Sequence, residues 1–105
     1  MKGKTRTKSE KQLHDQIAQL GCIACLHDGV NNYHVSLHHV DGRTKPDAHK
    51  KVLPLCAEHH QHNDLDPMGR IGVHPYKARF EALYGRQNDL IKEVYMLIGV
   101  EYDCA

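Results

Sequence analysis

The sequence predicts an α+β fold, a small single domain in which a two-stranded β-hairpin and a short helix hold metal-binding side chains and further helices flank them. A chain of 105 residues with 40% hydrophobic residues, no Trp and one Phe is long enough for one modest core. Ten His and four Cys supply a metal site that would staple such a core. Short β-type segments between stretches of helical periodicity place the hairpin inside the chain.

The chain is expected to open with a basic arm and a helix. Residues 1–7 carry Lys2, Lys4 and Arg6, and they form either a flexible arm that contacts nucleic acid or an ordinary solvated terminus. Apolar side chains recur at helical spacing through residues 8–20, and Gly21 is placed to end that helix. The domain itself is therefore expected to span residues 8–105.

Two extended segments follow. Residues 33–40 are rich in β-branched and aromatic side chains, and residues 51–55 are largely apolar, so each predicts a strand. A long polar and basic connection, residues 41–48, lies between them. The second strand is expected to run into a helix of two to three turns that ends near Asn63.

Two more helices complete the predicted order. Pro75 suits the first turn of a helix over residues 75–84. The last helix is expected over residues 87–98, with Gly99 as its stop. Residues 66–74 are expected to be irregular.

Two half-sites of matching spacing predict a structural metal. Cys22 and Cys25 lie three positions apart, and Cys56 and His59 repeat that spacing. Three thiolates and one imidazole form a closed tetrahedral zinc site. Adjacent His60 is the alternative to His59 as fourth ligand. The alternative interpretation is that these cysteines are only small, buried hydrophobic residues. Two half-sites of matching spacing favour zinc.

The expected compartment agrees with a metal rather than a disulfide. No segment is apolar enough to span a membrane, and no apolar segment follows the basic N-terminus to make a secretory signal. We therefore expect a cytoplasmic protein, in which Cys22 and Cys25 stay reduced. Cys104 fits no half-site and is assigned no role.

A second histidine cluster indicates chemistry. On a helix His60 and Asp64 lie one turn apart on one face, and His59 points about 100° away. Adjacent His38 and His39 on a strand face opposite ways, so one can join a metal with His60 and Asp64 while the other acts as a base. A metal beside a base suits phosphodiester hydrolysis. A second structural site or a solvated histidine patch is the alternative.

Further residues are candidates for contacts with phosphate. His74 precedes a helix start, where it either helps bind phosphate beside the helix amides or serves only as a helix-entry residue. Basic side chains in the connection and beyond are either contacts to the nucleic-acid backbone or solvated charges. They are Arg43, Lys45, Lys50, Lys51, Arg70, Lys77 and Arg79.

These motifs carry a resemblance to a known family. The residues concerned are Cys22-x-x-Cys25, His38-His39, the basic connection and Leu55-Cys56-x-x-His59-His60-x-x-x-Asp64. They resemble the HNH (ββα-metal) nuclease motif with its upstream zinc knuckle. More narrowly, residues 21–25, 38–46, 52–56 and 69–75 resemble the phage recombination-enhancement nucleases, which are RecA-dependent HNH enzymes.

The resemblance implies roles for individual residues. It makes His39 the general base and His38, His60 and Asp64 the ligands of a catalytic Mg²⁺ or Mn²⁺. It implies single- or double-stranded DNA and a RecA filament as partners, a bacterial cytoplasm as the setting and a phage or prophage gene as the source. The products would carry 5′ phosphate and 3′ hydroxyl ends.

One family feature is missing. The family usually has an asparagine that orients the base, and its position falls near Lys51 in this sequence. Lysine has no hydrogen-bond acceptor, so either a backbone carbonyl or His49 must orient His39.

Two rival functions remain open. A non-catalytic zinc module that binds nucleic acid or protein would need the Cys22, Cys25, Cys56 and His59 set but neither His39 nor Asp64. An RNA-directed nuclease is the other alternative, because the sequence offers no base-reading feature that excludes it.

Overall fold

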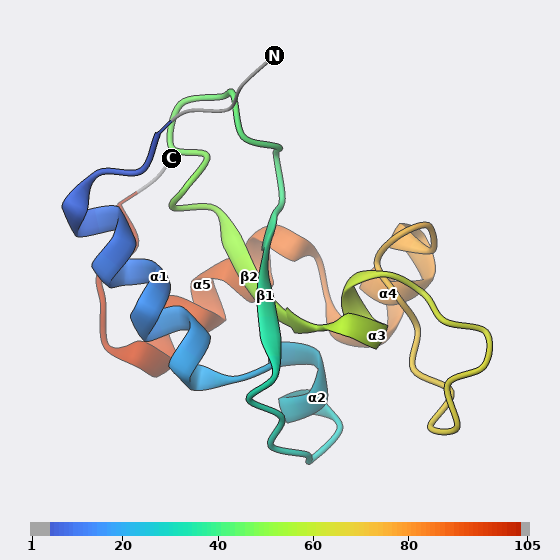
Figure 1. The fold of residues 1–105 in the computed structure, drawn as a ribbon. Helices are drawn as coiled ribbons and strands as arrows, with labels where there is room; N and C mark the ends of the chain where they lie inside the picture. Colours follow the sequence, from blue (N-terminus) through green and yellow to red (C-terminus); the bar gives the residue numbers. More distant parts are fainter. Residues whose placement is uncertain (1–4, 104–105) are drawn as a thin grey trace.

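A two-stranded antiparallel hairpin lies at the centre of the structure, a computed structural model that describes residues 5–103 (Figure 1). The described elements follow the order α1 (Lys8–Leu20), α2 (Ile23–His27), β1 (Val35–His39), β2 (Val52–Cys56), α3 (Ala57–His60), α4 (Lys77–Tyr84) and α5 (Gln87–Ile98). In the view of Figure 1, α1 lies on one side of β1, and α3 and α4 lie on the other. The predicted α+β class is therefore confirmed.

The hairpin carries the site residues in a fixed register. Val35 pairs with Cys56 at one end, and His39 pairs with Val52 at the other. β2 is buried along its whole length, because helices cover it. β1 is shorter than the predicted 33–40, and within it only His38 is buried.

The helix α1 matches its predicted range of residues 8–20. Its start is fixed by a capping box, in which the Thr7 hydroxyl accepts from the Glu10 amide and the Glu10 carboxylate accepts from the Thr7 amide, at 3.2 and 2.8 Å. Residues 1–4 of the predicted basic arm lie outside the described residues. The flexibility of the arm remains a prediction.

The helix α3 is shorter than predicted. It ends at His60 because Gln61 turns to an extended backbone, with φ of −126° and ψ of 122°, and pairs with His74 in a parallel bridge. The His62 amide donates to the His74 carbonyl at 2.7 Å, and the His74 amide donates to the His60 carbonyl at 3.1 Å. Residues 61–74 therefore form a loop that returns to α3 rather than extending it.

A close backbone approach closes this loop. A Cβ at Gly72 would overlap the backbone of His62, so only glycine allows the two segments to meet.

The hydrophobic core of the domain includes Ile17, Ile23, Val52, Leu53, Leu55, Phe80, Ile91 and Val94. In the described part of the chain, no helix combines the length and apolar character needed to cross a membrane.

Candidate metal centres and active site

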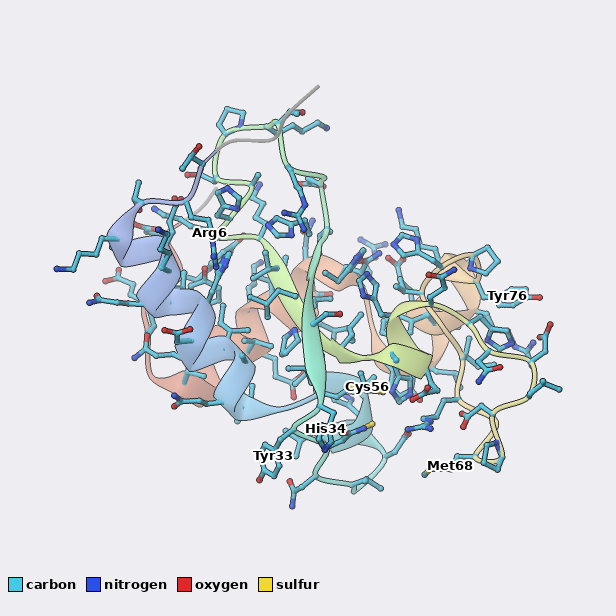
Figure 2. All side chains as sticks on the ribbon, viewed as in Figure 1. Arg6, Tyr33, His34, Cys56, Met68 and Tyr76 are labelled. Atoms are coloured by element: carbon cyan, nitrogen blue, oxygen red, sulfur yellow. The ribbon has the colours of Figure 1, made fainter. Side chains whose placement is uncertain are left out.

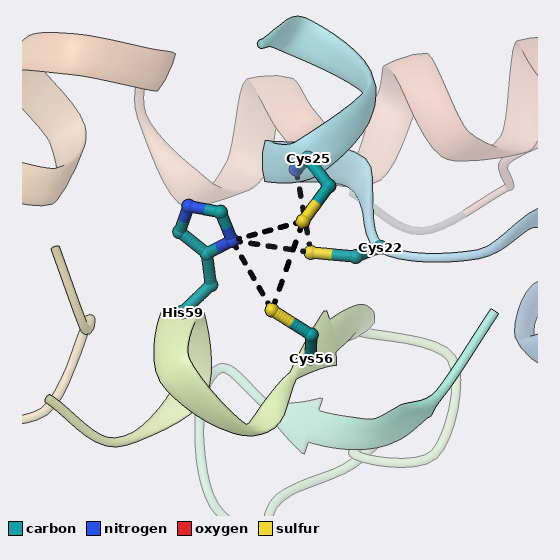
Figure 3. Close-up of side chains that lie close together, drawn as sticks. All are labelled: Cys22, Cys25, Cys56 and His59. Carbon is teal, nitrogen blue, oxygen red and sulfur yellow. Dashed lines mark hydrogen bonds between the residues drawn. The ribbon is translucent and has the colours of Figure 1, made fainter. Parts of the chain in front are cut away.

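Three thiols and one imidazole converge where α2, β2 and α3 meet (Figure 3). The Nδ1 atom of His59 lies 3.5, 3.4 and 3.3 Å from the sulfurs of Cys22, Cys25 and Cys56. The sulfurs of Cys25 and Cys56 are 3.7 Å apart. All four side chains are buried.

These separations fit a tetrahedral zinc ion. With Zn–S bonds of about 2.3 Å and Zn–N bonds of about 2.05 Å, the edges of a tetrahedron are roughly 3.8 Å between sulfurs and roughly 3.6 Å between sulfur and nitrogen. The observed distances lie within about 0.3 Å of those edges. The four predicted ligands are thus brought together, with His59 rather than His60 facing the sulfurs, and the cluster could hold zinc.

Groups outside the cluster fix the tautomer of His59. The Tyr84 hydroxyl donates to the Asp28 carboxylate at 2.9 Å and lies 3.1 Å from Nε2 of His59. The Tyr84 oxygen therefore accepts from Nε2–H, which leaves Nδ1 unprotonated and aimed at the sulfurs. Burial lowers the pKa of His59 and keeps the ring neutral.

The thiols need a cation to ionise together. Burial raises the pKa of the Cys22 thiol to about 12, and it also raises that of Cys25. Weak donors already point at the sulfurs, namely the Asn32 amide toward Cys25 at 3.8 Å and the Arg70 guanidinium toward Cys56 at 4.0 Å. A bound zinc ion would supply the charge that buried thiolates require.

Three further histidines form a second cluster, and they come from β1, α3 and the loop of residues 61–74. His38, His60 and His74 each offer a ring nitrogen, and these atoms lie within 4.8 Å of one another, so the group could hold a metal ion. The ring centroids are 5.1 Å apart for His38 and His60, and 5.0 Å apart for His38 and His74. Burial lowers the pKa of His38 to about 4 and also lowers that of His60, so both rings are neutral at neutral pH.

Hydrogen bonds orient two of these rings. The Gln87 side-chain oxygen lies 2.8 Å from Nε2 of His38 and can only accept, so Nε2 carries the proton and Nδ1 is free. The Ser36 hydroxyl lies 2.9 Å from Nδ1 of His60 and can accept from Nδ1–H, the tautomer in which Nε2 is free to bind a metal. Two side chains from β1 and α5 thereby fix which nitrogens can face a metal.

Asp64 is placed differently from the prediction. Its side chain is 87% exposed, and its carboxylate lies 3.0 Å from Nε2 of His62. The predicted one-turn spacing from His60 does not form, because α3 ends at His60. The return of the loop brings His74 to the cluster instead.

His39 faces the opposite side of the hairpin from His38, as alternation along a strand requires. Its Nε2 lies 3.0 Å from Nδ1 of His49, one of the two candidates for orienting it. Nε2 of His14 in turn lies 2.6 Å from the His49 carbonyl. His14, His39 and His49 also offer ring nitrogens within 4.8 Å of one another.

The basic residues predicted to contact DNA divide into two groups. Arg70 lies in a partly buried ion-pair network, with both Asp66 oxygens at 2.8 Å and Glu58 at 3.3 Å. Its guanidinium braces the loop, and a contact of Arg70 with phosphate remains a prediction. Lys50 lies 3.5 Å from Asp103, and Lys51 lies 3.8 Å from Asp41. The exposed members are Arg43, Lys45, Lys77 and Arg79.

The sequence argument missed Gln87, Tyr84 and His14. Two of them leave a signal in the helical pattern. Gln87 lies three residues before Leu90 on the buried face of α5, and His14 lies three residues before Ile17 on the buried face of α1. A polar side chain on an apolar helix face needs a partner, and here each partner belongs to the site.

The fold and the two clusters define a small α+β domain with a zinc-type Cys₃His site and a separate three-histidine site. Residues 6–98 match the family model described as recombination enhancement, RecA-dependent nuclease. The chain belongs to this family, so the resemblance to recombination-enhancement, RecA-dependent nucleases is confirmed. The family description indicates a RecA-dependent nuclease in recombination enhancement.

The zinc-type site makes a prediction about stability. Replacing Cys22→Ser removes one thiolate, and we expect zinc content to fall and the free energy of unfolding to drop by about 5 kcal/mol or more. Metal analysis and thermal unfolding measure the two effects. Cys104→Ser, outside the described residues, is the matched control. Full zinc content and unchanged unfolding in Cys22→Ser would contradict the assignment.

The orientation of His38 makes a second prediction. Gln87→Leu keeps the side chain's size but removes the acceptor for Nε2–H of His38, so affinity for Mn²⁺ at the three-histidine site should fall about 10- to 100-fold. Titration of the zinc-loaded protein, followed by electron paramagnetic resonance, measures this. Asn88→Leu, at the exposed neighbouring position, should bind Mn²⁺ as the wild type does. Equal affinities in both variants would argue against the role of Gln87.

Proposed function

We propose that this chain is an HNH-type, metal-dependent endonuclease that hydrolyses phosphodiester bonds of RecA-bound DNA. The observation that carries the proposal is the pair of neighbours on β1. His38 joins the three-histidine cluster on one side, and His39 lies on the other side with its Nε2 3.0 Å from Nδ1 of His49. One strand thus supplies a candidate metal ligand and a candidate general base at successive positions.

The ligand side consists of His38, His60 and His74, with His74 in place of the predicted Asp64. When bound there, a Mg²⁺ or Mn²⁺ ion would neutralise a phosphate oxygen and the charge on the departing oxygen. The chain's own contribution is to present three neutral imidazoles in fixed orientation. Gln87 and Ser36 hold the first two rings by hydrogen bonds.

The proposed general base is His39, and His49 is the residue that orients it. Burial and the nearby charge of Arg43 lower the pKa of His39 to about 4, so the ring is neutral at pH 7. Because Nε2 lies against His49, the buried and unpartnered Nδ1 is the nitrogen that would accept a proton from water once substrate is bound. His49 lies against Nε2 and restrains the ring. A phosphodiester anion bound beside the ring would raise its pKa toward the working pH and strengthen it as a base.

The decisive comparison is His39→Ala with His34→Ala, which removes an exposed histidine just before β1. Both are assayed for cleavage of circular single-stranded and duplex DNA with Mg²⁺, with and without RecA and ATP. Loss of a general base should reduce cleavage by about 10²- to 10⁴-fold. His34→Ala should cut as the wild type does, and both variants should retain zinc.

The other outcomes separate the rival functions. Cleavage of naked DNA would keep the nuclease and remove the requirement for RecA. Cleavage of RNA in preference to DNA would reassign the substrate. Absence of cleavage under every condition, with intact zinc and measurable DNA binding, would instead favour a non-catalytic zinc module.

A further inference from the structure

A cavity of about 350 Å³ lies on the α1 side of β1. Its described lining consists of Arg6, His14, Ser36, Leu37, His39 and Arg43. Two guanidinium groups face it, and none of these lining residues is acidic. The cavity therefore has the charge of an anion site, and it touches the imidazole that we propose as the base.

Arg6 is held at this cavity by a buried side chain. His14 is 3% exposed, and its Nδ1 lies 3.1 Å from the Arg6 guanidinium. An arginine can only donate, so Nδ1 of His14 accepts, and Nε2–H donates to the His49 carbonyl. In Figure 2, Arg6 lies beside the N-terminal part of α1, on the opposite side of β1 from Tyr76.

This bonding also argues against a metal among His14, His39 and His49. Both ring nitrogens of His14 are engaged, and one of them faces a cation. Burial and the Arg6 charge both lower the pKa of His14, which agrees with a neutral ring. The trio is therefore a hydrogen-bonded support that joins Arg6 to the turn carrying His49.

We propose that the cavity binds a backbone phosphate of the nucleic-acid strand, with Arg6 and Arg43 as its cationic ligands. Guanidinium groups match phosphate oxygens in both charge and geometry. The inference rests on the proposed nuclease function and deepens it. A nucleic-acid strand bound both in the cavity and at the three-histidine site would pass over β1. A phosphate in the cavity would therefore set the position of the nucleic acid relative to His39.

Binding can be measured apart from cleavage. A fluorescein-labelled 12-nucleotide oligothymidylate is titrated with the full-length, zinc-loaded chain without Mg²⁺, and anisotropy is followed at several salt concentrations. Arg6→Gln and Arg43→Gln should each weaken binding roughly fivefold at low salt and reduce the slope of log K against log salt by about 0.7. Lys92→Gln, an exposed cation on α5, is the control and should leave both unchanged.

A second measurement locates the anion. The side-chain Nε–Hε signals of ¹⁵N-labelled arginine are recorded during titration with inorganic phosphate and with the oligonucleotide, and the Arg→Gln variants assign the signals. We expect the Arg6 and Arg43 signals to shift with both probes. A shift with inorganic phosphate alone, with oligonucleotide affinity unchanged in the variants, would overturn the assignment to nucleic acid.

Failure of this inference is distinct from failure of the nuclease proposal. If DNA is cut in a His39-dependent way while both arginine variants bind and cut as the wild type does, the phosphate site is wrong and the nuclease stands. If no DNA is cut but both arginine signals respond to the oligonucleotide and the variants bind it weakly, the phosphate site stands and the nuclease does not.

Discussion

The convergence of Cys22, Cys25, Cys56 and His59 is the constraint on which the other features depend. It joins α2, β2 and α3. The chain segment between Cys25 and Cys56, which contains β1, is therefore held together at its two ends. His60 follows His59 directly on α3, and its position is therefore set by the neighbouring cluster. A structural metal of this kind would serve the second site by fixing the helix that supplies one of its histidines.

Strand β1 divides the functional groups between two environments. Alternation turns His38 toward His60 and His74, and His39 toward His49 and the cavity lined by Arg6 and Arg43. The ligand side is fixed by Gln87 from α5, and the base side is supported by His14 from α1. The helices that flank the hairpin thus supply the side chains that orient the histidines, and the α+β arrangement itself brings the two sets together.

Local patterns predicted much of this arrangement. Helical periodicity placed α1 and α5 at their observed ranges, and the two half-sites identified the Cys₃His cluster because ligand spacing is a local property. The pairing of His60 with Asp64 failed because the end of α3 is set by a distant segment. Gln61 leaves the helix to pair with His74, and the meeting requires the glycine at position 72. Helical spacing alone contains no information about the pairing of a distant segment with the end of α3.

The central claim is that His38, His60 and His74 form the second metal site beside His39. The most direct measurement is the number of imidazole nitrogens bound to Mn²⁺ in the zinc-loaded protein, counted from hyperfine couplings in wild type, His74→Ala and Asp64→Ala. We expect three nitrogens in wild type and in Asp64→Ala, and two nitrogens with weaker Mn²⁺ binding in His74→Ala. Three nitrogens in His74→Ala, or loss of Mn²⁺ binding in Asp64→Ala, would contradict it.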